Sequence, residues 1–121
     1  MSRLAEIDIG EQDGVPVARI RGELDLSNAG DIADALEVAV GPTAPGLVVD
    51  MTGLRHIDSA GVRILFDLRG RLAHRRQRLA LVVPDDAPIK EVLTLVSVAE
   101  AMPVCTSAAG ALEQVRSRGA A

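Results

Sequence analysis

The spacing of apolar and polar residues at the start of the chain predicts two strands joined by a tight turn. Leu4, Ile7 and Ile9 stand among polar residues, and an apolar run over residues 15–21 follows the turn signal Gln12-Asp13-Gly14. Short strand-like segments on either side of an Asp-Gly pair are typical of a β-hairpin. We therefore expect the domain to open with a hairpin.

Four later segments carry apolar residues at the spacing of a helix. We expect them to begin after Ser27 or Asn28, at about Ala60, after Asp85 or Asp86, and after Ser107. Their predicted inward-facing residues are Ile32, Leu36, Ala39 and Val40; then Val62, Leu65, Leu68 and Leu72; then Ile89, Val92, Leu93 and Val96; and lastly Ala111, Leu112 and Val115.

Short apolar runs separate these helical segments and predict further strands. The runs over residues 47–51 and 79–83 are continuously apolar or nearly so, which is typical of strands covered on both faces, and residues 103–106 predict a short final strand. Helices alternating with strands favour parallel pairs joined by crossover helices. The prediction is an α/β domain over residues 4–116, with a mixed sheet of four to five strands, about four helices, and a flexible tail at 117–121.

Composition narrows the possible partners and the compartment. The net charge is −4 and only one residue is aromatic, which argues against direct nucleic-acid binding and against an anionic membrane surface. The single cysteine cannot form an internal disulfide, and no apolar run is long enough for membrane insertion. We expect a cytoplasmic protein of one domain.

Motifs for catalysis, metals and cofactors are missing from the sequence. The two histidines, His56 and His74, do not stand in a metal-ligand spacing, and no glycine-rich phosphate loop follows any predicted strand. We therefore expect no cofactor, no metal and no enzyme activity. A small hydrolase or nucleotide-binding protein that uses His56 or Asp50 is the enzymatic alternative.

The most informative local motif is Asp58-Ser59-Ala60-Gly61, placed where the second helix begins. Either Asp58 or Ser59 is a good helix N-cap, because its side-chain oxygen accepts from a free backbone N–H. A serine at this position is also well placed to hold a phosphate, since the helix N-terminus favours negative charge. Capping and regulation are both open for Ser59 on this pattern.

Three segments combine into a recognisable set of motifs. Gly22-Glu23-Leu24-Asp25 follows the second strand, Val48-Val49-Asp50-Met51-Thr52-Gly53-Leu54 spans the central strand and its turn, and Asp58-Ser59-Ala60-Gly61-Val62 begins the next helix. Together they resemble the STAS domain family and, within it, the bacterial anti-sigma-factor antagonists. In that family the third motif reads Asp-Ser-Ser/Thr-Gly-Leu.

This resemblance implies a STAS-like single domain and a signalling mechanism. Antagonists of this kind bind an anti-sigma factor, which is also a serine kinase with an ATP-binding fold, and so release the sigma factor. The kinase phosphorylates the serine that follows the motif aspartate, here Ser59, and the phosphorylated antagonist no longer binds. A dedicated serine phosphatase resets it.

The resemblance also implies a docking surface around this serine. Asp25 and Asp58 are expected to form that surface or to orient the hydroxyl, although a local turn role for Asp25 is equally open. The implied partner-binding residues are Asp25, Asp58, Ser59, Ala60, Gly61, Val62 and Arg63.

Two residues depart from the family pattern. Ala60 replaces the usual second hydroxyl residue, and Arg63 stands where many members have a small residue, so it either changes partner choice or pairs with a phosphate on Ser59. The Ala60 departure keeps an alternative open, a constitutive STAS subunit of an ABC-type lipid transport complex without a phosphorylation switch. For the oligomeric state, the sequence is compatible with a monomer and with a weak dimer.

Overall fold

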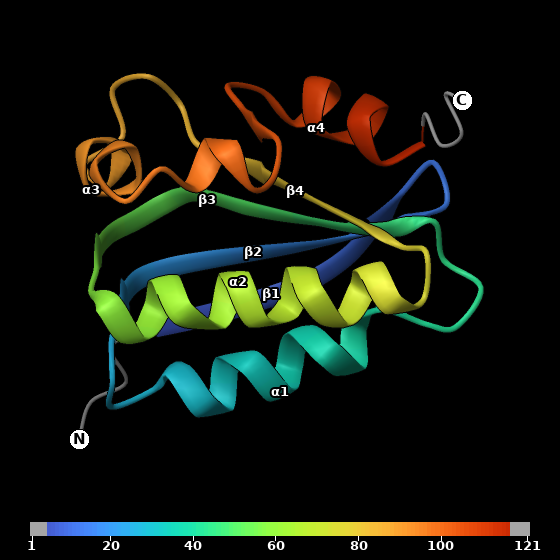
Figure 1. The fold of residues 1–121 in the computed structure, drawn as a ribbon, viewed down its shortest axis with the longest axis horizontal. Helices are drawn as coiled ribbons and strands as arrows, with labels where there is room; N and C mark the ends of the chain where they lie inside the picture. Colours follow the sequence, from blue (N-terminus) through green and yellow to red (C-terminus); the bar gives the residue numbers. More distant parts are fainter. Residues whose placement is uncertain (1–4, 117–121) are drawn as a thin grey trace.

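Residues 5–116, which the computed structural model describes, form a five-stranded sheet with four α-helices and one short 3-10 helix, η1 (Figure 1). This confirms the predicted fold class. Residues 1–4 and 117–121, with Leu4 and the predicted tail, lie outside this description. In chain order the elements are β1 (Ala5–Gln12), β2 (Val15–Leu24), α1 (Ala29–Ala39), β3 (Gly46–Ile57), α2 (Ser59–His74), β4 (Arg78–Val82), α3 (Lys90–Leu95), η1 (Val98–Glu100), β5 (Val104–Cys105) and α4 (Ala108–Arg116).

The strands lie in their sequence order, β1-β2-β3-β4-β5. β1 and β2 form the predicted antiparallel hairpin, and its two turn residues, Asp13 and Gly14, both have positive φ (54° and 81°), as a tight hairpin turn requires. The remaining neighbours are parallel. The carboxyl ends of β2, β3 and β4 therefore meet at one edge of the sheet.

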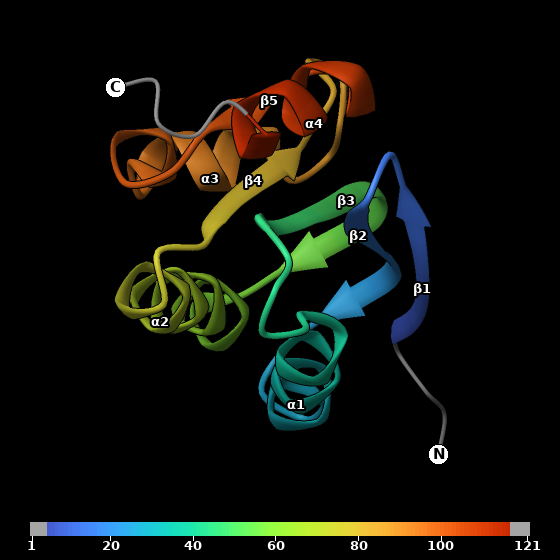
Figure 2. The ribbon, with the colours of Figure 1, turned by 90° about the vertical axis from the view of Figure 1, so that its right-hand side faces the viewer.

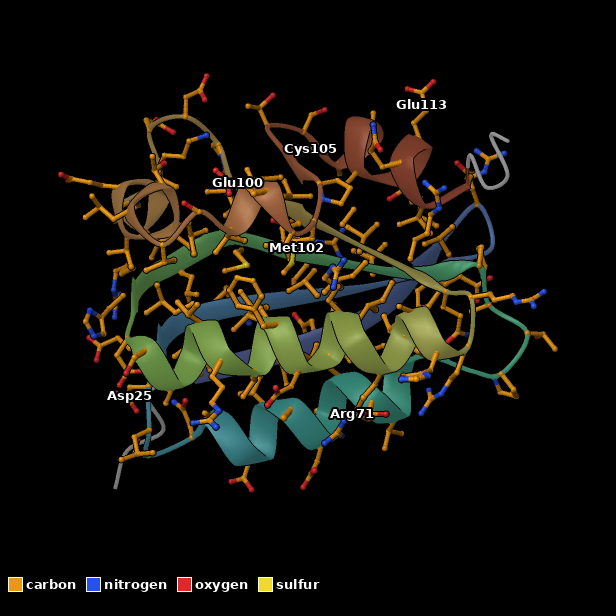
Figure 3. The ribbon with its side chains drawn as sticks, in the orientation of Figure 1. Asp25, Arg71, Glu100, Met102, Cys105 and Glu113 are labelled. Carbon is orange, nitrogen blue, oxygen red and sulfur yellow. The ribbon has the colours of Figure 1, made fainter. Side chains whose placement is uncertain are left out.

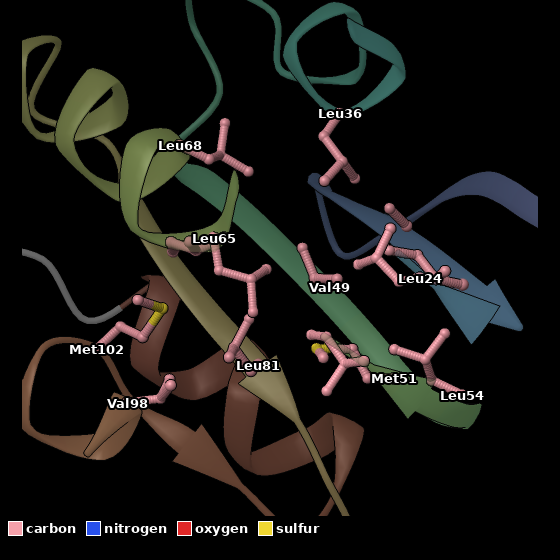
Figure 4. Close-up of a cluster of buried hydrophobic side chains, with 14 of the residues drawn as sticks. Leu24, Leu36, Val49, Met51, Leu54, Leu65, Leu68, Leu81, Val98 and Met102 are labelled. Carbon is pink, nitrogen blue, oxygen red and sulfur yellow. The ribbon is translucent and has the colours of Figure 1, made fainter. Parts of the chain in front are cut away.

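Helices cover the two faces of the sheet unequally. α1 and α2 lie side by side on one face, and α4 packs on the other (Figure 2). The larger core lies under α1 and α2 and also includes Leu93 of α3 and Val98 of η1; Val98 is labelled with other members of this core in Figure 4. Its members are aliphatic residues and methionines, and leucine is the commonest, for example Leu24, Leu36, Leu65 and Leu81, as expected for a chain with a single phenylalanine.

β3 is longer than predicted and corrects the strand assignment. It runs from Gly46 to Ile57 instead of ending at Met51, because β2 pairs with it from Val48 to Ile57. Two register shifts in the β2–β3 pairing accommodate the extra residues of β3. The Asp50 carboxylate accepts bonds from the backbone N–H and the hydroxyl of Thr52 (3.0 and 2.6 Å) beside the first of these shifts.

The third helix is shorter than predicted, and two of its expected core residues are exposed. α3 begins at Lys90, because the chain first makes turns around Pro84 and Pro88, which lack a backbone donor. Leu93 is buried as predicted, whereas Val92 and Val96 are 36% and 43% exposed. The periodicity locates the helix, but no other element covers these two residues.

The core under α1 yields a matched pair of stability predictions. Leu36 is fully buried and Val38, two residues later on the same helix, is 85% exposed. Leu36→Ala should lower the free energy of unfolding by about 2–5 kcal/mol through lost burial and a cavity. Val38→Ala should change it by less than about 0.5 kcal/mol. Urea unfolding followed by circular dichroism measures both, and equal losses would contradict this placement of the core.

Candidate functional site

The two sequence motifs meet at the carboxyl edge of the sheet. Leu24, at the end of β2, pairs with Ile57 at the end of β3, and the backbone N–H of Asp58 donates to the Leu24 carbonyl (3.2 Å). The loop after β2 therefore lies against the start of α2, and the labelled Asp25 is seen there in Figure 3. Parallel pairing of β2 and β3 creates this neighbourhood from segments more than thirty residues apart.

Asp58 is the N-cap of α2 and also holds the neighbouring loop. One oxygen of its carboxylate accepts from the Gly61 N–H (3.0 Å), and the other accepts from the Leu26 N–H (3.2 Å). The Gly61 N–H is the main reason that the pKa of Asp58 lies below its usual value, with smaller contributions from the N–H groups of Leu26 and Ala60. Burial opposes this effect only in part. The carboxylate is therefore charged at neutral pH and links the two motifs.

Ser59 is exposed and is the first residue of α2. The sequence pattern left the cap to either Asp58 or Ser59, and the structure assigns it to Asp58. The helix also begins at Ser59, one residue earlier than predicted. Within residues 5–116 the Ser59 hydroxyl makes no hydrogen bond to another protein group. Its oxygen is therefore available to a partner.

Asp25 organises the loop after β2. Its carboxylate accepts from the N–H and the hydroxyl of Ser27 (3.0 and 2.6 Å), which is the turn role left open above. Asn28 stands at the N-cap position of α1 but does not cap it; its side chain accepts from the Asp25 N–H and donates to the Glu23 carbonyl. This network holds the loop beside Asp58.

Leu26 also belongs to this candidate surface, although none of the sequence motifs indicates it. Its side chain is 80% exposed at the tip of this loop, while its backbone N–H is held by Asp58. The available signal is an apolar residue directly after the Gly-Glu-Leu-Asp motif, within a turn. The polar groups of this loop form hydrogen bonds within the loop or to Asp58, which holds its backbone in place. The Leu26 side chain therefore offers an apolar contact to a partner at a defined position.

The seven predicted partner-binding residues divide between surface and interior. Asp25, Asp58 and Ala60 are half-buried, and Ser59 and Arg63 are exposed. Gly61 and Val62 are instead buried and face the core. Their contribution to the site is to seat α2 against the sheet, beneath the surface that the other five residues form.

Asp50 and His56, the residues of the enzymatic alternative, form no catalytic arrangement with Ser59 among the described residues. Asp50 bonds to Thr52 and lies 3.8 Å from Arg19, and no hydrogen bond joins His56 to Ser59 in the described part of the chain. Among residues 5–116, no three His, Cys, Asp or Glu side chains are grouped as metal ligands would be. Over the same range, no helix is both long and apolar enough to cross a membrane.

The geometry and the motifs agree with a known family. A protein-family model described as the STAS domain matches residues 6–111. The chain belongs to the STAS domain family. No curated protein matches the sequence significantly, so the further comparisons are with solved structures.

Solved structures with the same fold include anti-sigma factor antagonists. One from Mycobacterium paratuberculosis is 24% identical with a TM-score of 0.82, and the match covers 93% of this chain and 94% of that one. The antagonist SpoIIAA in its unphosphorylated form is 19% identical with a TM-score of 0.73, covering 92% and 96%. A sulfate transporter family protein from Wolinella succinogenes is 20% identical with a TM-score of 0.67, covering 87% of each chain. At these identities, the similarity establishes the STAS fold.

Gly61 yields a test of how closely α2 approaches the sheet. A Cβ built there would lie 2.7 Å from Ile57 Cγ1 and 2.9 Å from Leu24 Cγ. Gly61→Ala should therefore destabilise the protein by about 1–3 kcal/mol. Gly70, in the same helix, has open space around such a Cβ, so Gly70→Ala should be stabilising by up to about 1 kcal/mol. Thermal unfolding compares the two, and a stabilising Gly61→Ala would contradict the close approach.

The Asp58 cap predicts a defined dependence on pH. Asp58→Ala should lower the free energy of unfolding by about 1 kcal/mol near neutral pH. Because the folded-state pKa of Asp58 lies below its unfolded value of about 3.9, this stabilisation is complete above the unfolded value. It is then lost as the pH falls through the folded-state pKa.

Urea unfolding at a series of pH values measures the difference in the free energy of unfolding between wild type and Asp58→Ala. It should stay constant from about pH 5 to 8 and shrink in more acidic solution. Asp86→Ala is the control, because Asp86 is an exposed carboxylate with no hydrogen bond within residues 5–116. A difference that persists unchanged down to about pH 2 would show that the ionised carboxylate is not what stabilises the start of α2.

Proposed function

We propose that this protein is an anti-sigma-factor antagonist that is switched off by phosphorylation of Ser59. It binds an anti-sigma factor that is also a serine kinase, and so frees the sigma factor; a serine phosphatase reverses the modification. The observation that carries the proposal is the division of roles at the start of α2. Asp58 caps the helix, which leaves the exposed Ser59 hydroxyl without a structural role in the described chain.

The site can accept a phosphate without refolding. Phosphorylation adds about −1.5 to −2 charges and three strong acceptor oxygens at neutral pH. At the first position of a helix, the positive end of the helix dipole and nearby backbone N–H groups favour that charge. Ser59 is exposed and the core residues beneath it, Gly61 and Val62, do not contact solvent appreciably. The modification therefore changes the surface and leaves the packing intact.

The same geometry explains how one phosphate would prevent binding. Asp58 and Ala60 flank Ser59 in the chain, and the loop with Asp25 and the exposed Leu26 is bonded to Asp58, so we expect a partner that binds Ser59 to contact this loop as well. Phosphate on Ser59 adds bulk and negative charge beside the ionised Asp58. A complementary surface then loses its fit and meets unfavourable charge.

Comparison with solved structures supports this proposal and also leaves the transport-subunit alternative open. SpoIIAA is known in a phosphorylated form as well as an unphosphorylated one, and both share this fold. The sulfate transporter family neighbour leaves a second candidate open, a constitutive STAS subunit of a transport complex, for which the sequence suggests an ABC-type lipid transporter. In that candidate Ser59 is not phosphorylated, and the partner is a transporter ATPase in place of a kinase.

The proposal predicts a specific loss of binding when a negative charge replaces the hydroxyl. Ser59→Asp should weaken binding to the cognate anti-sigma kinase by about tenfold or more, a cost of about 1.4 kcal/mol. Incubation with that kinase and ATP should add one phosphate to the wild type and none to Ser59→Ala. Isothermal titration calorimetry and intact mass spectrometry measure the two effects.

Ser107→Asp provides the matched control for this experiment. Ser107 precedes α4, where its hydroxyl accepts from the Gly110 N–H (3.1 Å), and α4 packs on the opposite face of the sheet. The substitution adds the same charge at a helix start and should leave kinase binding within about twofold. Equal affinity of wild type and Ser59→Asp would refute the switch. Co-purification with a transporter ATPase, without phosphate on Ser59, would favour the transport subunit.

A further inference from the structure

Arg63 is a basic residue of α2 that stands four positions after Ser59. Because α2 begins at Ser59, both residues are helical and stand in an i,i+4 relation on one exposed face. Side chains with this spacing are neighbours, with Cβ atoms about 5–6 Å apart. Had Ser59 been the extended N-cap residue, this geometry would not hold. The cap assignment to Asp58 therefore makes Ser59 and Arg63 neighbouring positions on α2.

Arg63 is also uncommitted within the described chain. Other arginines of α2 are engaged: Arg69 donates to the Ala101 carbonyl, and Arg71 pairs with Glu37 (2.7 Å). No hydrogen bond or ion pair to Arg63 occurs among residues 5–116. Its guanidinium can therefore turn toward a new anion without breaking an existing contact.

The groups closest to Ser59 in the two motifs include the acidic residues Asp25 and Asp58, so a basic side chain on the same helix would stabilise a phosphate further than the helix N-terminus alone does. Asp58 is ionised at the N-cap, and its two oxygens already accept backbone N–H groups. The charged and titratable groups nearby include His56 and Arg55 at the end of β3, Glu23 at the end of β2, and Asp25 and Asp58 in the two loops. On α2 itself, Asp67 stands four residues after Arg63, although no ion pair joins the two within residues 5–116. Arg55 lies 4.0 Å from Glu23, which already offsets its charge.

We propose that Arg63 is a positioning residue that binds the phosphate of phosphorylated Ser59 within the same helix. The inference rests on the Ser59 switch of the proposed function and adds its regulation. An anion that precedes a cation by four residues has the favourable orientation along a helix, and a guanidinium binds phosphate oxygens in a bidentate manner. The contact turns the phosphate away from Asp58 and along the exposed face of α2, over the surface a partner would use.

The test measures the phosphate itself and does not depend on any kinase. Phosphoserine is placed at position 59 during translation, and the second pKa of the phosphate, ordinarily near 6, is measured by phosphorus NMR. An adjacent guanidinium favours the dianion, so the wild-type pKa should lie about 0.3 pH unit or more below that of Arg63→Gln. Arg63→Lys should keep most of the lowering, because it retains the charge.

Arg76→Gln is the matched control, since Arg76 is exposed beyond the far end of α2 and is not among the described ion pairs. It should leave the phosphate pKa within about 0.1 pH unit of wild type. The comparison is repeated in a His56→Asn background, which removes the imidazole at the end of β3. If the phosphate pKa values of wild type and Arg63→Gln differ by less than about 0.1 pH unit, the proposal is wrong. It is also wrong if Arg63→Lys raises the phosphate pKa as much as Arg63→Gln does.

Failure of this proposal is distinct from failure of the proposed function. If no kinase modifies Ser59, the phosphate pKa in the translated phosphoserine protein still shows whether Arg63 contacts it. If the kinase does modify Ser59 and the pKa is insensitive to Arg63, the switch stands and the intrahelical contact is wrong. Circular dichroism of each variant verifies that the helix content is unchanged.

Discussion

The site is organised around the carboxylate of Asp58, which joins two segments distant in the chain. One oxygen caps α2 through Gly61, and the other fixes the loop after β2 through the Leu26 N–H. A single charged group thereby sets where the helix begins and where the neighbouring loop lies. It also frees Ser59 from capping, and the regulatory proposal depends on that separation of roles. Without Asp58, the serine next to it would be the remaining candidate cap.

This arrangement requires α2 to approach the sheet closely. Gly61 is buried against Leu24 and Ile57, the last residues of the two central strands. The fully buried Leu65 follows on the same face, within the aliphatic core beneath α1 and α2. The rigid part of the molecule thus ends directly below Ser59, so a charge added there acts on the surface and on whatever binds it. A site of this kind suits a protein whose regulation acts on binding and leaves the fold unchanged.

Local patterns predicted the elements well, because hairpin turns, helical periodicity and apolar runs are short-range features. They failed where distant segments decide the outcome. β3 continues past Met51 only because β2 lies beside it, although Thr52-Gly53 resembles the end of a strand. Val92 and Val96 fit the helical period, yet no element covers them. For the site, the motifs located Asp25, Asp58 and Ser59, but Asp58 and Ser59 are equally good caps by residue type. The bond from the Leu26 N–H to Asp58, and thus the exposed Leu26 beside the serine, follows from the pairing of β2 with β3.

Phosphorylation of Ser59 in the cell is the central claim, and intact mass spectrometry of the protein purified from its own host tests it most directly. If Ser59 is phosphorylated, a fraction of molecules should be about 80 Da heavier than the unmodified chain, which is the mass of one phosphate. Peptide fragmentation should place that addition on Ser59, and the fraction should disappear in Ser59→Ala. Unmodified mass under every growth condition, with the protein bound to its partner throughout, would contradict the account.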